Sequence, residues 1–556
     1  MWTVAALATA TLVAIPIVAV LSSLAAPAPE VWRHLLRTQL AELTLNTLGL
    51  LLGVGLGVLV LGTGLAWLVV ACRFPGRAFF EWALVLPLAV PAYVIGFVFL
   101  ALLDFTGPIQ TTLRQLLGPD LRLPEIRSGG GVIVVMTLVL YPYVYTLARA
   151  AFLEQGLDTL EAARSLGLSA RRVFLRVTLP MARPSIATGV SFALMEALAD
   201  FGTVATFGYR TYTEAIYRVW YGMFDRLAAT QLAVVLLGFA ALLLSLERYS
   251  RGRARYTQVG RHGRSPMPVR LGGWSAVAAT TSCLAVFALA FALPVTQLVA
   301  WAGRVLAREG LPRDFGQALG SSVWLAGVSA ACAAVIAVIL AYAGRLRRSR
   351  LVALAARFSA LGYALPGSVI AVGVLLPMGW LDRVLAVALR TGLGAEAGLL
   401  LTGSVVGLVF AYLVRFLAVA FQTVDAALTR ISTNLDDAAR SLGARTGKTL
   451  RRVHLPLMWR GLGAALTLVF VDVMKEMPAT ILLRPFGLDT LAIGVWLRTS
   501  ESLWEEAAIP ALAIVLAGLG PVALTMRGLA GRAPRRRSRE TVKPETLPVW
   551  RPGLRS

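Results

Sequence analysis

Long apolar runs alternate with short polar segments along almost the whole chain. A helix of about 20 apolar residues crosses the hydrocarbon core of a bilayer, and windows of that length predict about twelve membrane-spanning helices. Six predicted spans lie in the first half of the chain, near residues 3–23, 46–72, 82–103, 131–151, 186–207 and 229–246. Six lie in the second half, near residues 274–301, 318–343, 355–378, 398–420, 461–483 and 507–527. The pattern predicts an all-α polytopic membrane protein.

The composition supports this fold class and excludes an ordinary soluble enzyme. Hydrophobic residues make up 57% of the chain and charged residues 15%, whereas soluble domains have roughly 45–50% and about 25%. The net charge is +24, which in a soluble protein would suggest nucleic acid. Here the arginines fall between apolar runs, so we expect basic loops at a membrane surface and no nucleic-acid partner.

The distribution of basic residues predicts the orientation in the membrane. Cytoplasmic loops carry an excess of Lys and Arg, and with an even number of crossings all the basic clusters fall on the same side. We therefore expect both termini to be cytoplasmic, and we interpret the first apolar run as a retained membrane helix. The basic clusters lie within residues 73–77, 164–183, 248–264, 345–350, 440–452 and 532–539.

Composition also predicts four regions along the chain. We expect a first six-helix half (1–246), a basic cytoplasmic linker (247–273), a second six-helix half (274–529) and a basic, disordered cytoplasmic tail (530–556). The three cysteines and three histidines are scattered, so neither a disulfide framework nor a metal site is predicted.

An internal repeat relates the two halves. Residues 161–180 read EAARSLGLSARRVFLRVTLP and residues 437–456 read DAARSLGARTGKTLRRVHLP, at one constant offset without a gap. At the same offset Glu196 aligns with Asp472 and Asp200 with Glu476. The chain is therefore predicted to be two homologous six-span halves fused head to tail.

The repeated segment is predicted to be a short amphipathic helix, a glycine turn and a second helix. Leu435, Ala438 and Leu442 recur at helical spacing on a helix too short to span a membrane. Asn434 is expected to cap it and Gly443 to end it in a left-handed conformation. The second helix is expected to stop before the proline of the repeat. The apolar face of the short helix requires a partner surface.

This repeat resembles the coupling-loop motif of ABC importer permeases. Residues that carry the motif are Glu161, Ala162, Ala163, Gly167 and Pro180 in the first half, and Asp437, Ala438, Ala439, Gly443 and Pro456 in the second. The resemblance implies that the coupling loops, about 156–183 and 432–459, each dock into a groove on a separate ABC ATPase subunit. It also implies a bacterial inner-membrane location and an extracytoplasmic solute-binding protein as a further partner.

The chain itself is not expected to bind ATP or to be an enzyme. Residues 443–449, GARTGKT, have only three residues between the glycines and follow no apolar strand. A phosphate-binding loop needs four residues between these glycines, so that backbone amides surround the phosphates. The resemblance places ATP on the partner subunits, and no cofactor or metal is expected in this chain.

Acidic residues inside two predicted spans are the candidates for a translocation path. Glu196 and Asp200, and likewise Asp472 and Glu476, are four residues apart and are expected to share one helical face. Carboxylates are costly in hydrocarbon and usually face a bundle interior or a water-filled path. In the alternative interpretation the acids are structural, with Lys475 neutralising one of them. Proline and glycine residues nearby could interrupt both helices.

Two further segments resemble the ferric-iron branch of fused ABC permeases. They are ALADFGTVATFG, and MKEMPATILLRPFGLDTLAIGVW from Met474 to Trp496. The expected function is therefore the permease subunit of an ATP-driven importer of ferric iron, with the binding protein docking near 208–228 and 484–504. Thiamine or another small solute is the alternative cargo, since thiamine permeases are similar and spermidine and sulfate permeases share the loop motif. A gradient-driven secondary transporter is the alternative from another class.

Overall fold

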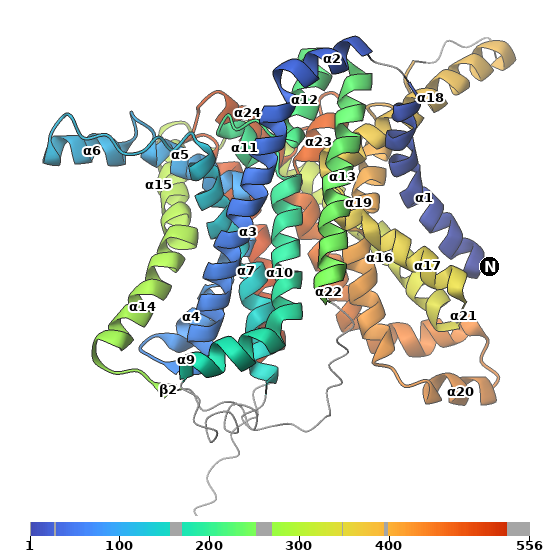
Figure 1. Cartoon of the computed structure of the whole chain (residues 1–556). Helices are drawn as coiled ribbons and strands as arrows, with labels where there is room; N and C mark the ends of the chain where they lie inside the picture. Colours follow the sequence, from blue (N-terminus) through green and yellow to red (C-terminus); the bar gives the residue numbers. More distant parts are fainter. Residues whose placement is uncertain are drawn as a thin grey trace, which may run out of the picture.

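The computed structural model describes residues 2–26, 29–155, 170–251, 269–346, 349–393 and 398–530. Helices dominate it and run mostly in one general direction (Figure 1). Helices of the first half are α1 (Trp2–Ser22), α2 (Pro29–Thr38), α3 (Leu40–Ala71), α4 (Arg77–Ala83), α5 (Ala92–Leu103), α6 (Pro108–Leu117), α7 (Gly129–Glu154), α9 (Ala170–Val173), α10 (Leu179–Ala199), α11 (Gly202–Thr206), α12 (Tyr212–Gly222) and α13 (Arg226–Arg251).

The second half repeats this order of long and short helices. Its helices are α14 (Gly273–Phe287), α15 (Leu293–Arg308), α16 (Phe315–Leu346), α17 (Arg350–Ser359), α18 (Gly367–Leu393), α19 (Val405–Thr429), α20 (Asn434–Ser441), α21 (Thr446–Thr449), α22 (Leu455–Met474), α23 (Pro478–Leu483), α24 (Leu491–Ser500) and α25 (Ala508–Ala530). Two-residue strands β1 (Cys72–Arg73) and β2 (Val269–Arg270) pair in parallel. Short 3-10 turns are η1 (Ser23–Ala25), η2 (Leu86–Ala89) and η5 (Ala360–Ala364), and π turns are η3 (Phe174–Thr178), η4 (Ala288–Ala292) and η6 (Leu450–His454).

The predicted all-α polytopic class is confirmed, with a difference in the spans. Among the described residues, 10 helical segments are long and apolar enough to cross a membrane, against about twelve expected from 20-residue windows. The two remaining predicted spans fall on α10 and α25. α10 carries Arg183 and Glu196, which lower its hydropathy, and α25 contributes only the shorter apolar segment Ala508–Ala523.

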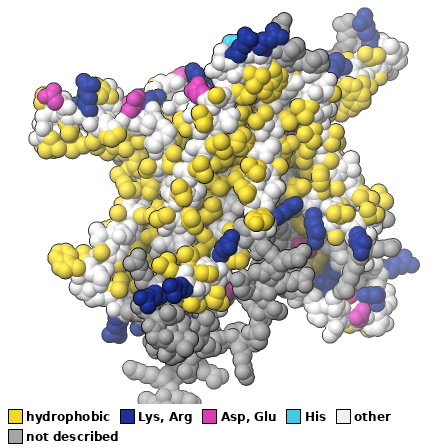
Figure 2. Space-filling view, in the orientation of Figure 1, with side chains coloured by type: hydrophobic (Ala, Val, Ile, Leu, Met, Phe, Trp, Pro, Cys, Tyr) yellow, Lys and Arg dark blue, Asp and Glu magenta, His cyan; other side chains and the backbone are white. Residues whose placement is uncertain are grey.

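Apolar side chains on the outside of the bundle mark the surface that faces lipid. On α3, Leu45, Leu52, Leu56 and Val60 are between 63% and 72% exposed. In Figure 2 hydrophobic side chains cover the middle of the visible face, and Lys and Arg gather toward its two ends. Because so large an apolar surface is unfavourable in water, this belt is the part of the protein that lies in the hydrocarbon core.

The first membrane helix of each half packs against the other half. α1 lies against α16, α17 and α18, while α14 contacts α4 and α15 contacts α5. In Figure 1, α1 accordingly lies next to α17, and α14 next to α4. Each half thus holds a helix of its partner, and the two halves cannot separate without losing these contacts.

The repeat proline does not end a helix, which corrects the sequence-based expectation. Pro180 and Pro456 lie in the first turn of α10 and α22, and the π turns η3 and η6 directly precede them at equivalent positions of the two halves. A proline lacks the N–H that an α-helix would use and its ring crowds the preceding turn. The wider π turn shifts the hydrogen-bonding pattern just before the proline, so the helix continues through it.

Candidate functional site

Six of the ten predicted coupling-loop residues lie among the described residues. Glu161, Ala162, Ala163 and Gly167 lie outside the described residues. Pro180 lies in the first turn of α10, and all five residues of the second motif are described. The second coupling loop consists of α20, a turn and α21, and it lies at the end of the molecule opposite α2 and α6 (Figure 1).

The turn after α20 has the geometry that its glycine predicts. Gly443 has φ +72°, in the left-handed region. Its N–H donates to the carbonyl of Arg440 at 2.9 Å, and the N–H of Ala444 donates to the carbonyl of Ala439 at 2.9 Å. This pair of hydrogen bonds is a Schellman motif, in which glycine avoids the strain of a Cβ. The expected cap is wrong, since Asn434 is already helical and Thr433 precedes it without a side-chain capping bond.

The second coupling helix exposes an apolar face. Leu435 is 42% and Leu442 85% exposed, and Ala438 between them is also exposed. Asp437, the acid of the motif, is exposed and pairs only with the exposed Arg440 on the same helix. An apolar stripe on a helix outside the membrane belt is what a partner surface would cover.

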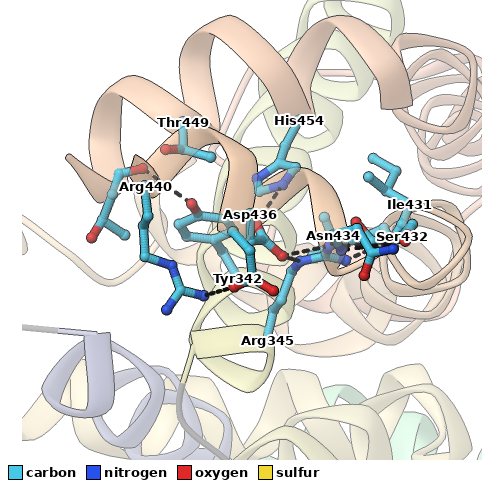
Figure 3. A network of polar contacts seen from close by, with 12 residues as sticks. Tyr342, Arg345, Ile431, Ser432, Asn434, Asp436, Arg440, Thr449 and His454 are labelled. Carbon is cyan, nitrogen blue, oxygen red and sulfur yellow. Dashed lines mark hydrogen bonds and ion pairs between the residues drawn. The ribbon is translucent and has the colours of Figure 1, made fainter. Parts of the chain in front are cut away.

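The opposite face of α20 is held by a polar network. Asp436 points inward and contacts Arg345 at the end of α16 and His454 at the start of α22 (Figure 3). One turn earlier on α16, the hydroxyl of Tyr342 donates to the carbonyl of Thr446 at 3.0 Å. Nothing local in the sequence distinguishes Asp436 from its neighbour Asp437, so this inward contact could not be predicted.

A cavity of about 110 Å³ lies between the two halves, well inside the bundle. All four predicted intramembrane acids line it: Glu196, Asp200, Asp472 and Glu476. The other polar residues that line it are Tyr93, Tyr143, Tyr363, Arg415 and Lys475. This volume has room for several water molecules, which need only about 10–15 Å³ each.

Both acid-bearing helices break within the cavity wall. α10 ends at Ala199 and α22 at Met474, and Gly202 and Pro478 begin the next helices. The expectation that both acids of a pair share a helical face is therefore wrong, because the second acid of each pair lies beyond the helix end. In the second half Pro478 disfavours helix at Met477, the residue before it, which helps to keep the segment between α22 and α23 non-helical.

The second acid of each pair caps the helix that follows the break. Asp200 Oδ1 accepts from the N–H of Thr203 at 2.8 Å, and Glu476 Oε1 accepts from the N–H of Ala479 at 3.2 Å. The two breaks also meet across the half–half boundary, since a Cβ on Gly202 would lie 2.5 Å from Cε of Met477. The equivalent acids thus stabilise equivalent irregular segments at the centre of the protein.

Positive charge in the cavity comes from the second half alone. Lys475 Nζ lies 2.9 Å from Oδ1 of Asp472, and Arg415 Nη1 lies 2.7 Å from Oε1 of Glu476. The acids of the first half have neutral partners: Glu196 accepts from the hydroxyl of Tyr363 at 2.9 Å, and Asp200 caps α11. Lys475 pairs with Asp472, as expected in the alternative interpretation in which the intramembrane acids have a structural role. Arg415 was missed, although it interrupts an apolar run and so carries a signal.

A second pocket adjoins the central cavity and is lined by residues of α11, α12 and α24, away from α20. Phe201 lines both this pocket and the central cavity, and its ring lies 4.8 Å from that of Tyr217 and 5.0 Å from that of Trp496. Glu214 also lines the pocket, and burial raises the pKa of its carboxyl although Arg218 opposes the shift. This aromatic cluster separates the two hollows.

Two repeats of membrane helices around a shared polar cavity, with a docking-type helix outside the membrane belt, define a membrane transport permease. The family model for the binding-protein-dependent transport system inner membrane component matches residues 49–255 and 333–537. The chain therefore belongs to this family of ABC importer permeases, and it is a multi-pass inner-membrane protein. Membership of this family argues against the alternative interpretation, in which the chain is a gradient-driven secondary transporter.

Similar proteins include permeases for several cargoes. The chain is 30% identical over 493 residues to the Fe(3+)-transport system permease protein FbpB 2 of Haemophilus influenzae, covering 88% of this chain and 90% of that protein. It is 30% identical to the molybdenum transport system permease protein ModB of Escherichia coli, over 39% of this chain and 94% of that protein. It is 35% identical to the sulfate transport system permease protein CysW of Escherichia coli, over 26% of this chain and 49% of that protein.

Proposed function

We propose that this chain is the transmembrane subunit of an ATP-driven, binding-protein-dependent importer of ferric iron. The observation that carries the proposal is the central cavity, in which both halves place carboxylates around one polar space. The similarity to a ferric-iron permease over nearly the whole of both chains supports the same cargo. Glu196, Asp200, Asp472 and Glu476 are then the walls of the translocation path.

The charge of the cavity favours a cation over an anion. Four carboxylates face two basic groups, and both basic groups already pair with acids of the second half. An anion such as sulfate would enter a site in which carboxylates outnumber basic groups four to two, which is electrostatically unfavourable inside a protein. The additional polar groups are mainly phenols, and carboxylate and phenol oxygens suit a hard cation.

The partners follow from the two ends of the protein. Two ABC ATPase subunits would bind the coupling loops, with Leu435, Ala438 and Leu442 of the second loop in the ATPase groove. They would bind and hydrolyse ATP, and this chain would carry no nucleotide. A solute-binding protein would dock at the opposite end, on residues near 208–228 and 484–504. That arrangement makes the α20 end cytoplasmic. Trp2 packs on Tyr342 near this end with ring centroids 5.1 Å apart, which supports a cytoplasmic N-terminus.

The function is tested by uptake into proteoliposomes that contain this chain, its ATPase subunits and a loaded binding protein. We expect ATP-dependent uptake of ⁵⁵Fe(III), and no uptake of thiamine or sulfate from the corresponding loaded proteins. Glu196→Gln and Asp200→Asn are expected to lower iron uptake about tenfold or more, as loss of about 1.4 kcal/mol at a path site would do. Asp425→Asn is the control, because Asp425 lies on α19 outside the central cavity. Uptake of iron without ATP or ATPase would contradict the proposal.

The turn of the second coupling loop provides another prediction. Gly443→Val is expected to uncouple or disassemble the complex while membrane insertion remains intact, because a β-branched residue is strained at φ +72°. Gly447→Ala is the matched control, since Gly447 lies four residues further on, in α21, and has no positive φ. Uptake and copurification of the ATPase subunits measure the effect. Equal uptake by both variants would show that the left-handed turn is dispensable.

A further inference from the structure

One carboxylate joins the second coupling helix to the membrane bundle. Oδ2 of Asp436 accepts a hydrogen bond from Nε of Arg345 at 2.9 Å and lies 2.7 Å from Nη2. Oδ1 of the same carboxylate lies 2.8 Å from Nε2 of His454, whose side chain is fully buried. In Figure 3 Asp436 lies between these two basic side chains. The ion pair thereby fixes α20 to α16, and the close contact with His454 places α20 against the π turn that leads into α22.

The same guanidinium also closes the end of α19. Nη1 of Arg345 donates to the carbonyl of Leu428 at 2.8 Å, and Nη2 donates to the carbonyl of Ile431 at 3.0 Å. A guanidinium has five N–H donors in a rigid fork and can satisfy a carboxylate and two carbonyls together. Arg345 therefore holds the ends of α16 and α19 and the start of α20 in one arrangement.

The helices held in this way reach the central cavity. α19 carries Arg415, and α22 leads to Asp472 and Lys475. A displacement of α20 consequently acts on the two helices that hold the basic residues of the cavity. Separating the partners of this partly buried network costs free energy because it leaves an uncompensated charge. We therefore expect α20, α16 and α19 to move together.

The sequence of the first half has none of these ionisable residues. At the constant offset of the repeat, Leu160 is the counterpart of Asp436 and Thr178 that of His454. The last residue but one of α3 is Val70, where α16 has Arg345. These three residues therefore have no ionisable counterparts at the equivalent positions of the first half, although the two loops share the same motif.

We propose that Asp436, Arg345 and His454 are positioning residues that hold the second coupling helix against the helices leading to the cavity, so that movement of the ATPase at α20 reaches α19 and α22. The inference rests on the proposed function and names the residues through which α20 acts on the cavity helices. ATP-driven movement at the second loop moves α19 and α22 together.

Asp436→Asn and Arg345→Met test this in the full complex in proteoliposomes. We expect the ATPase subunits still to copurify, because the exposed face of α20 is unchanged. Stimulation of ATP hydrolysis by the loaded binding protein, and uptake, should fall by about 5- to 150-fold, the range typical of coupling between sites. Hydrogen exchange of amides 434–441 should become faster. The loss of stimulation in Arg345→Lys should be smaller than that in Arg345→Met, because lysine keeps the positive charge but lacks the planar, multidentate guanidinium.

Glu81→Gln is the matched control. Glu81 pairs with Arg149, whose side chain is 11% exposed, as is that of Arg345, and the pair ties α4 to α7 of the first half. We expect near-normal stimulation and unchanged exchange of amides 434–441. The proposal would be overturned if ATP hydrolysis were stimulated normally in Asp436→Asn, or if Glu81→Gln lost as much stimulation as Asp436→Asn. It would also be overturned if the ATPase failed to copurify with Asp436→Asn. Failure of the unsubstituted chain to bind the ATPase would instead overturn the proposed function.

Discussion

Arg415→Met is expected to destabilise the protein more than any other single substitution at the cavity. The Nη1 atom of Arg415 donates to Oε1 of Glu476 at 2.7 Å, and the side chain of Glu476 is only 1% exposed. Removing the guanidinium leaves a buried carboxylate without its cation, which costs about 3–5 kcal/mol. The free energy of unfolding of the purified protein, from a denaturant titration in detergent micelles, measures the loss.

A second substitution distinguishes the effect of the unpaired buried charge from the effect of lost side-chain packing. Arg415→Met combined with Glu476→Gln should recover much of the stability, because neither buried charge remains. Arg127→Met removes an exposed ion pair with Asp104 and should cost at most about 1 kcal/mol, since water screens that pair. If Arg415→Met were no more destabilising than Arg127→Met, the pair at the cavity would not be the buried pair described above.

Replacing Leu435 and Leu442 together by Asp is expected to abolish uptake by preventing the ATPase from docking. The two leucines are the largest side chains on the exposed apolar face of α20. Burying one leucine contributes about 1.5–3 kcal/mol, and each 1.4 kcal/mol changes affinity tenfold. Loss of both therefore weakens docking by about a hundredfold or more. Copurification of the ATPase with the tagged permease, followed by titration of the ATPase, measures the affinity.

Leu399→Asp is the control for this surface substitution. Leu399 is 70% exposed, comparable to the coupling-helix leucines, and precedes α19 rather than lying in a coupling loop. It should leave the affinity for the ATPase unchanged. Because α20 keeps Asp436 and its inner contacts, the double variant should remain folded. An unaltered affinity in the double variant would mean that the ATPase does not use this face.

The local pattern of the sequence was sufficient for the class and for the repeated loop. Runs of apolar residues predict membrane helices because burial in lipid depends on each segment alone. The left-handed turn at Gly443 was likewise predicted correctly, since a helix end with glycine is a local preference. The family resemblance rested on two matched motifs, and the family match over both halves confirms it.

Periodicity was a poor guide wherever a helix is interrupted. Asp200 and Glu476 were expected within helices and instead cap the next ones. Pro456 was expected to end a helix and lies inside one, after the π turn η6. A regular period of 3.6 residues describes only an unbroken α-helix, and breaks and π turns depend on neighbouring elements that satisfy the backbone.

By itself the sequence determined the membrane class, the duplication and the left-handed turn at Gly443, because hydropathy, repetition and turn preference can be recognised from short stretches of sequence. Only the tertiary structure decided that α1 packs against the second half, that Arg415 pairs with Glu476, and that Asp436 rather than Asp437 anchors the coupling helix. These contacts join helices distant in the chain, and their energies depend on which surfaces the packing brings together.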